Sequence, residues 1–342
     1  MATQNNALGQ DSEIIELSPK ELLPILIDHA KNGEAVGIEG PPGSAKTDVV
    51  KQAAAAAGLP LMIFNLELSD TTDGKGLPFR DPDNKNQVVY IKDKRWLVDY
   101  PFANFMDELP RGTIPVQGTA ATMLLENRID DLYMPNGMWH VWAGNRTVDK
   151  AGANRVPSII YQRSFMYATK YDVEAQVEWM VQQGDLDLLT MRYLRMKGDA
   201  ALSFDPNKKI NPTSRSWTTT ARKLFAKPNV SFATLAGVIG KGPASELVAF
   251  RALAPTLPSP EEVLLTPKDA LAPDNFSAQF LISDMLADLA SFNNFDALAE
   301  YAQRLFPEIQ AKFVKDCITR APEVQSTRAF VAWGIKFAEV LR

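Results

Sequence analysis

A short stretch rich in glycine and ending in lysine and threonine carries the clearest chemical potential in the sequence. It reads GPPGSAKT over residues 40–47 and follows the apolar run AVGIE. Successive backbone N–H groups in such a loop can enclose a phosphate, and the dipole of the following helix adds to the attraction. Lys46 would reach the β and γ phosphates of a nucleotide, and the Thr47 hydroxyl would ligate Mg²⁺. We therefore predict a nucleotide-binding loop made of Gly40, Pro41, Pro42, Gly43, Ser44, Ala45, Lys46 and Thr47.

The loop departs at one position from the usual pattern G-x-x-x-x-G-K-S/T. Ala45 stands where the second glycine belongs. Because alanine carries a methyl group, we expect the loop to keep its phosphate-binding shape if the φ angle of Ala45 is negative. The alternative is an ordinary strand-to-helix turn that contains Gly and Lys by chance. The apolar strand before the loop and the helix-forming run after it favour the nucleotide site.

A pair of acidic residues follows a second apolar segment further along the chain. The segment FANFMDELP, residues 102–110, delivers Asp107 and Glu108 at the end of a predicted strand. Asp107 would organise Mg²⁺ through its water ligands, and Glu108 would polarise an attacking water. Paired acids are commonly just a solvated loop, but together with the phosphate loop they favour nucleotide hydrolysis over phosphate transfer to an acceptor. Asn104 interrupts the apolar run, so we expect that strand to be strained or partly exposed.

The elements expected around these residues alternate between helices and strands. Ser18, Pro19 and Glu21 predict the capped start of a helix that ends at Gly33. A strand is expected on each side of the phosphate loop's helix, and a further strand at 87–91 would form a hairpin. This alternation predicts a parallel sheet covered by helices. The other segments that suit buried strands are 61–66, 102–106, 139–144 and 164–169.

Helices alone are expected from about residue 172, and a proline-rich connector begins near residue 256. We therefore predict four parts. They are a flexible N-terminus at 1–17, an α/β nucleotide-binding core at 18–171, a helical lid at 172–255 and a C-terminal helical extension at 256–342.

Composition limits the class of protein. With 342 residues and 46% hydrophobic residues, the chain can bury substantial cores. One cysteine, Cys317, excludes an intrachain disulfide, and His29 and His140 do not form a zinc site with it at any usual spacing. The sequence shows no secretory leader and no apolar run long enough for a membrane span, so we expect a soluble, cytoplasmic protein. A net charge of -5 makes nucleic acid an unlikely partner.

Four segments together resemble the MoxR branch of the AAA+ ATPases, which includes the RavA-like ATPases. They are GPPGSAKT, MDELPRGTIPVQGTAATMLLENRI, MPNGMWHVWAGNRTVDKAGANRVPSIIYQRSF and TSRSW, and the resemblance extends over about residues 18–255. It implies an α/β fold, with a P-loop AAA+ parallel-sheet core that has helices on both faces, followed by an all-α lid and a C-terminal helical extension. Alanine before the loop lysine resembles a variant tolerated in that branch.

The resemblance also implies roles for residues outside the two motifs. Asn145 matches the sensor 1 residue, which would hold the attacking water or the γ-phosphate, although it could simply cap a turn. Arg163 matches the arginine finger that reaches the ATP of a neighbouring subunit, with Arg155 and Arg146 as alternatives. Arg215 matches the sensor 2 residue of the lid, or it merely flanks its helix. Residues 68–81 resemble the branch's insertion after the second strand.

The machine implied by this resemblance binds ATP and Mg²⁺ in a ring, expected to be a hexamer. It would couple hydrolysis to chaperone-like remodelling of a partner protein, with a von Willebrand A domain protein as the expected partner. The alternatives are a nucleic-acid-linked AAA+ motor or helicase loader, and a module that uses ATP only as a clamp. The last helical block, 276–342, is the candidate surface for an adaptor.

Overall fold

The structure, a computed structural model, describes residues 13–146 and 154–336. Of the N-terminus predicted to be flexible, residues 1–12 lie outside the described residues. The chain forms two compact units, an α/β unit that runs to Trp179 and includes Leu202–Trp217, and a helical unit formed by Met180–Ala201 and the chain from Thr218 onward.

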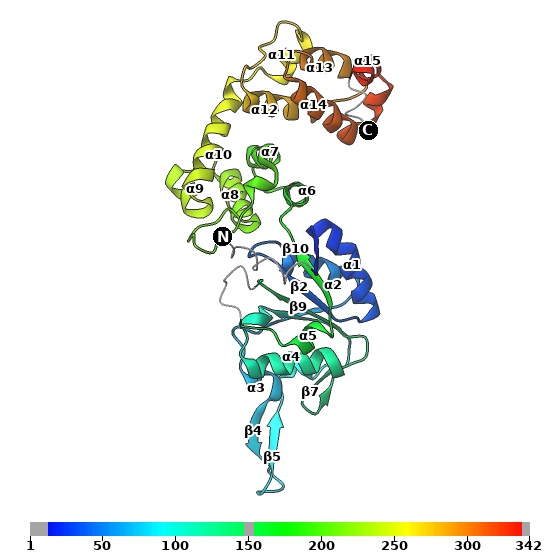
Figure 1. Ribbon diagram of the computed structural model, residues 1–342, viewed down its shortest axis with the longest axis vertical. Coiled ribbons are helices and arrows are strands. Elements are labelled where there is room, and N and C mark those ends of the chain that lie inside the picture. Colours follow the sequence, from blue (N-terminus) through cyan, green and yellow to red (C-terminus); the bar gives the residue numbers. More distant parts are fainter. Residues whose placement is uncertain (1–12, 147–153, 337–342) are drawn as a thin grey trace, which may run out of the picture. The chain divides into compact units, whose positions relative to one another are not determined.

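A six-stranded sheet forms the centre of the α/β unit (Figure 1). Its strands lie in the order β1-β10-β2-β9-β6-β3, and every neighbouring pair is parallel. The central strands are buried along almost their whole length, as expected for a sheet covered on both faces. The strands are β1 (Ile15–Leu17), β2 (Val36–Glu39), β3 (Leu61–Asn65), β6 (Ala103–Asp107), β9 (Trp139–Gly144) and β10 (Phe165–Thr169).

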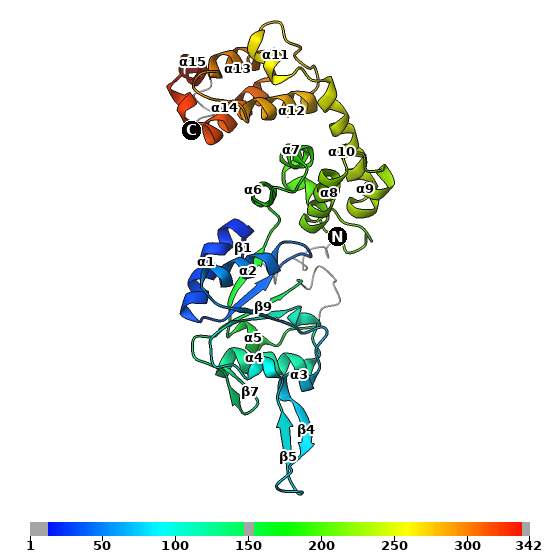
Figure 2. The same cartoon turned by 180° about the vertical axis from the view of Figure 1, so that it is seen from behind.

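Helices cover both faces of this sheet (Figures 1 and 2). Apolar residues of α1 (Pro19–Asn32) and α2 (Lys46–Ala56) pack on one face, and those of α4 (Ile114–Glu126) and α5 (Ser158–Tyr161) pack on the other. The predicted capped helix start is confirmed, because Ser18 and Glu21 form a capping box and Gly33 ends α1 in the left-handed region. The sheet with helices on both faces, followed by helices alone, confirms the predicted α/β fold class.

A two-stranded hairpin projects from the α/β unit beyond the short helix α3 (Thr71–Lys75) (Figures 1 and 2). It pairs β4 (Leu77–Arg80) with β5 (Val88–Ile91), which confirms the extra strand predicted at 87–91. Every residue of both strands is exposed. The Lys75 ammonium lies 4.9 Å from the centroid of the Tyr90 ring. A second small hairpin joins β7 (Arg128–Ile129) to β8 (Leu132–Tyr133).

Asn104 on β6 corrects one expectation from the sequence. It was expected to leave its strand strained or partly exposed, but its side chain is completely buried. Its amide nitrogen lies 3.2 Å from Nδ1 of His140, and Nε2 of the same ring lies 2.9 Å from Oδ1 of Asn127. Burial lowers the pKa of His140 to about 4. The neutral ring with its proton on Nε2 accepts from Asn104 and donates to Asn127, so a polar partner makes burial of Asn104 tolerable.

The short strand β1 corrects a second expectation. Residues 1–17 were predicted to be flexible, yet Ile15–Leu17 adds to the edge of the sheet and pairs with β10. A segment of three residues with exposed or half-exposed side chains has no hydrophobic pattern that would predict a strand. The strand forms because its backbone pairs with β10.

The helical unit is built from helices that pack around a second apolar core. Cys317 is completely buried in that core, and burial raises the pKa of its thiol to about 12. The chain passes from one unit to the other within α6 and again within α8. The remaining helices are α6 (Val173–Gln183), α7 (Leu188–Lys197), α8 (Ser214–Ala226), α9 (Phe232–Ile239), α10 (Lys241–Leu253), α11 (Pro260–Leu265), α12 (Phe276–Ala287), α13 (Phe295–Ala302), α14 (Pro307–Arg320) and α15 (Arg328–Lys336). None of the helices that the structure describes has the length and hydropathy needed to cross a bilayer.

A buried carboxylate joins three helices of this unit. Asp284 on α12 is 1% exposed, and its oxygens lie 2.9 Å from Arg192 of α7 and 2.7 Å from Arg320 of α14. The Lys312 ammonium lies 3.5 Å away. Burial disfavours ionisation of Asp284, but the positive charges of Lys312, Arg320 and Arg192 outweigh it and lower the pKa of Asp284. This network fixes α7 against α12 and α14.

Candidate nucleotide site

The predicted phosphate loop connects the buried strand β2 to the first turn of α2. Because β2 lies between β10 and β9, the loop leaves the sheet at its carboxyl edge, beside the ends of both neighbours. Gly40 donates its N–H to the carbonyl of Gly144 at 3.2 Å. Gly43 has a φ of +74°, which glycine adopts without strain. The backbone therefore turns sharply at the point where the sequence places its glycines.

Ala45 does not have the negative φ angle on which the expectation for the loop depended. Its φ is 66° and its ψ is 17°, so it lies in the left-handed region as the N-cap of α2. An alternation of right-handed and left-handed residues turns successive N–H groups into one concavity, and this geometry favours anion binding. The methyl group is accommodated at a conformational cost of about 1–2 kcal/mol. The loop thus keeps the shape that glycine would give it, at the expense of strain.

Lys46 occupies the interior of the loop. Its side chain is buried, and its ammonium donates hydrogen bonds to the carbonyl oxygens of Gly40 at 2.8 Å and Pro41 at 3.0 Å. It also donates to Oδ1 of Asn145 at 3.2 Å. A buried ammonium needs such partners, and phosphate oxygens in the loop would replace the carbonyls.

The two predicted acids lie next to this lysine. The Thr47 hydroxyl lies 3.4 Å from Oδ2 of Asp107, and the amide of Asn145 donates to Glu108 at 3.3 Å. Asp107 is the last residue of β6, and Asn145 directly follows β9, the neighbouring strand. The structure therefore brings together Lys46 and Thr47 of the loop with both acids and Asn145, residues that come from three separate parts of the sequence.

Burial is the main influence on both carboxyl groups. It raises the pKa of Asp107, against the opposing effects of a hydrogen bond from the Glu108 N–H and the positive charges of Lys46 and Arg215. Burial also raises the pKa of Glu108, and the charge of Asp107 raises it further. Glu108 has a φ of 54°, a strained conformation for a residue with a side chain. The chain turns at this residue, directly after the end of β6.

The predicted arginines fall into different environments. Arg215 is the second residue of α8, and its charge reaches Asp107 within the α/β unit. Arg146 pairs with Glu16 at 3.1 Å. Arg163 and Arg155 make no side-chain hydrogen bond or ion pair among residues 13–146 and 154–336. Arg163 precedes β10, at the edge of the sheet opposite the phosphate loop.

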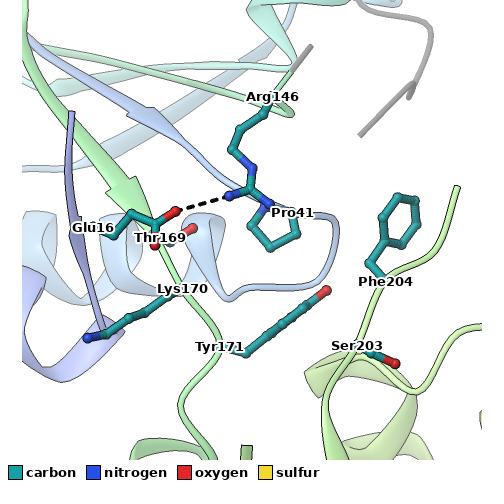
Figure 3. Close-up of a pocket in the computed structure, with 8 residues that line it drawn as sticks. All are labelled: Glu16, Pro41, Arg146, Thr169, Lys170, Tyr171, Ser203 and Phe204. Atoms are coloured by element: carbon teal, nitrogen blue, oxygen red, sulfur yellow. Dashed lines mark hydrogen bonds and ion pairs between the residues drawn. The ribbon is translucent and has the colours of Figure 1, made fainter. Parts of the chain in front are cut away.

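A pocket of about 280 Å³ opens beside the phosphate loop (Figure 3). Pro41, Tyr171 and Phe204 supply its apolar and aromatic lining, and the Glu16–Arg146 ion pair lies along it. Tyr171 and Phe204 were not predicted from the sequence. Single aromatic residues in connecting segments have no periodicity, so only the fold shows that they meet at the loop.

Oxygen donors near the loop fit a magnesium ion. Thr47 and Asp107 offer a hydroxyl and a carboxylate, and Mg²⁺ is usually held by one or two carboxylates together with water and substrate phosphates. Among the side chains that the structure describes, no group of three or more His, Cys, Asp or Glu residues is placed to hold a metal ion. The donors present thus suit a metal bound together with a phosphate.

No protein-family model and no curated protein matches this sequence. Among solved structures, the chain is similar to NtrX from Brucella abortus in complex with ADP, at 14% identity and a TM-score of 0.43, over 94% of this chain and 68% of that one. It is also similar to the RuvB Holliday junction branch migration motor of Thermotoga maritima, at 16% identity and a TM-score of 0.37, over 76% of each chain.

Proposed function

We propose that this chain is an AAA+ ATPase of the MoxR type that hydrolyses ATP at the loop of residues 40–47. The observation that carries the proposal is the meeting of Lys46, Thr47, Asp107, Glu108 and Asn145 at one edge of the sheet. A strand-to-helix turn without a function would not need a buried lysine, two desolvated acids and a polar bridge between them.

Each of these residues has a part in the proposed reaction. Lys46 exchanges its loop carbonyls for oxygens of the β and γ phosphates, which keeps its charge compensated. Thr47 and Asp107 would hold Mg²⁺, which when bound neutralises phosphate charge. Glu108 accepts the proton of the attacking water, and its raised pKa makes it a stronger base. Asn145 fixes Glu108 through the hydrogen bond of 3.3 Å.

The pocket beside the loop is the proposed site of the nucleotide base. Tyr171 and Phe204 offer aromatic surface, and Pro41 joins the pocket directly to the phosphate loop. A volume of about 280 Å³ is large enough to hold a purine ring.

We propose further that the site is completed between subunits of a ring, expected to be a hexamer. Arg163 lies at the sheet edge opposite the loop of its own chain, which supports a role in a neighbour's site. Arg155 remains the alternative, whereas Arg146 is engaged with Glu16. ATP hydrolysis would drive the remodelling of a protein client, with a von Willebrand A domain protein as the expected partner. Arg215 would contact the γ-phosphate and so make the position of the helices that follow it depend on the bound nucleotide.

Two substitutions test the site itself. Glu108→Gln should abolish ATP turnover while ATP still binds, and Lys46→Ala should abolish binding. Glu308→Gln, an exposed acid on α14, is the matched control and should change neither. Binding is measured with a fluorescent ATP analogue and turnover by phosphate release. Tight binding by Lys46→Ala would show that the loop is not the site.

Mixed subunits test the arginine. Arg163→Ala and Glu108→Gln subunits should each be inactive alone, and their mixture should regain turnover because an intact finger then faces an intact base. If the mixture stays inactive although both variants assemble and bind ATP, Arg163 is misassigned, and the experiment is repeated with Arg155→Ala. Duplex or single-stranded DNA should leave turnover unchanged; stimulation would favour the nucleic-acid motor instead.

A further inference from the structure

Two hydrogen bonds tie the phosphate loop to the end of β10. The Tyr171 hydroxyl donates to the carbonyl oxygen of Pro42 at 2.6 Å, and the hydroxyls of Ser44 and Thr169 lie 2.6 Å apart. Both contacts hold the middle of the loop. Residues 158–171, which include α5 and β10, are called the clasp segment below.

The clasp segment also contacts the beginning of the loop. The Tyr161 hydroxyl donates to Oε1 of the buried Glu39 at 2.6 Å, directly before Gly40. A Cβ atom on Gly40 would lie 2.0 Å from Oγ1 of Thr169, so the loop backbone and β10 are packed without spare room. A displacement of the loop must therefore displace the clasp segment, because close-packed groups transmit strain.

Arg163 lies within this same segment. It follows Tyr161 by two residues and precedes Phe165, the first residue of β10. β10 runs parallel to β2, with Phe165 opposite Val36 and Ala168 opposite Glu39. At a rise of about 3.3 Å per residue, β10 links the residues that contact the loop to Arg163 over a distance on the order of 15 Å.

We propose that Tyr161, Thr169 and Tyr171 are positioning residues through which the nucleotide state of the phosphate loop sets the position of Arg163 on the same chain. When phosphate replaces the carbonyl partners of Lys46, the loop backbone at Gly40 and Pro41 is released from that ammonium. The clasp segment passes the resulting change to Arg163, and thereby to the site of the neighbouring subunit. This inference rests on the proposed function, in which Arg163 acts between subunits.

A mixed assembly separates this coupling from catalysis. Acceptor subunits carry Arg163→Ala and retain Glu108, whereas donor subunits carry Glu108→Gln and retain Arg163. Turnover then comes only from acceptor sites completed by a donor arginine. Tyr171→Phe is added to the donor alone, where it removes one hydroxyl and keeps the ring. We expect turnover in the mixture, at saturating ATP, to fall about threefold to tenfold, the effect of one hydrogen bond.

The matched control is Tyr133→Phe in the donor, whose ring is 73% exposed and lies outside the clasp segment. It should leave the mixture unchanged. If Tyr171→Phe subunits fail to assemble, Tyr161→Phe takes their place at the other end of the segment. Turnover that is unaffected by the donor substitution refutes the coupling and leaves the trans arginine intact. A mixture that is inactive before any tyrosine is changed refutes the proposed arginine role, and the coupling with it.

Discussion

Replacing Ala45 by glycine should stabilise the α/β unit, an unusual outcome for a substitution at a helix terminus. Ala45 has a φ of 66°, which costs a residue with a Cβ about 1–2 kcal/mol relative to glycine. Glycine in turn adds about 0.4–1 kcal/mol of conformational entropy to the unfolded chain. The difference leaves a net gain of roughly 0.5–1 kcal/mol, or a rise in Tm of about 1–3 °C for a unit of this size.

Scanning calorimetry measures this change, and hydrogen exchange in α2 localises it. The matched control is Ala55→Gly, an exposed position inside α2, where the same chemical change should cost about 0.5–1 kcal/mol. Ala45→Val should destabilise the unit more than Ala55→Gly does, because a β-branched side chain fits the left-handed region poorly. If Ala45→Gly lowers the Tm as Ala55→Gly does, position 45 is not strained and the loop keeps its shape without conformational cost.

Three further substitutions have predictable effects on stability. Burial raises the pKa of Glu108, so the stabilising contribution of its protonated form is present below the ordinary pKa and is lost as pH rises through the raised one. Glu108→Gln should therefore raise Tm at pH 7 and leave it unchanged near pH 3. His140 has the opposite effect, because its pKa of about 4 means that the free energy of unfolding falls by roughly 3 kcal/mol as pH falls from 6.5 to 4. His140→Asn should flatten that part of the pH–stability curve. At pH 7 the variant should be less stable than the unchanged protein. Asp284→Ala should destabilise the helical unit in urea by about 3–5 kcal/mol, because it leaves buried cations without their carboxylate. The same change at Asp316, on the rim of that network, should cost less than about 1 kcal/mol, and equal costs would contradict the placement of Asp284 at the centre of the network.

The parts of the fold that could be predicted from the sequence are those specified by local chemistry. Ser18 and Glu21 cap a helix through bonds between neighbours in the sequence, and Gly33 ends it for a steric reason that needs no tertiary structure. Asp107 and Glu108 were predicted at the end of β6 because an apolar run that stops at two charges marks the point where a buried strand reaches solvent. Their joint action with Lys46 was predicted because both segments follow apolar strands at a suitable separation in the sequence.

The parts that could not be predicted depend on contacts between distant residues. Asn104 was expected to disturb its strand because the sequence does not reveal His140 as its partner. The sequence left the sign of the φ of Ala45 open, because intrinsic preference favours negative values whereas the tertiary shape of the loop enforces a positive one. Tyr171 and Phe204 are distant in the sequence, and only the folded chain brings them together at the pocket.

Because its one cysteine, Cys317, is buried, this chain is convenient for site-specific labelling and spectroscopy. The thiol of Cys317 is far from forming a thiolate at neutral pH, so it should resist maleimide reagents while the protein is folded. A cysteine introduced at Val88, exposed on the projecting hairpin, would then take up a fluorophore selectively. Energy transfer between that label and a fluorescent ATP analogue would follow the hairpin through a turnover cycle without any background substitution.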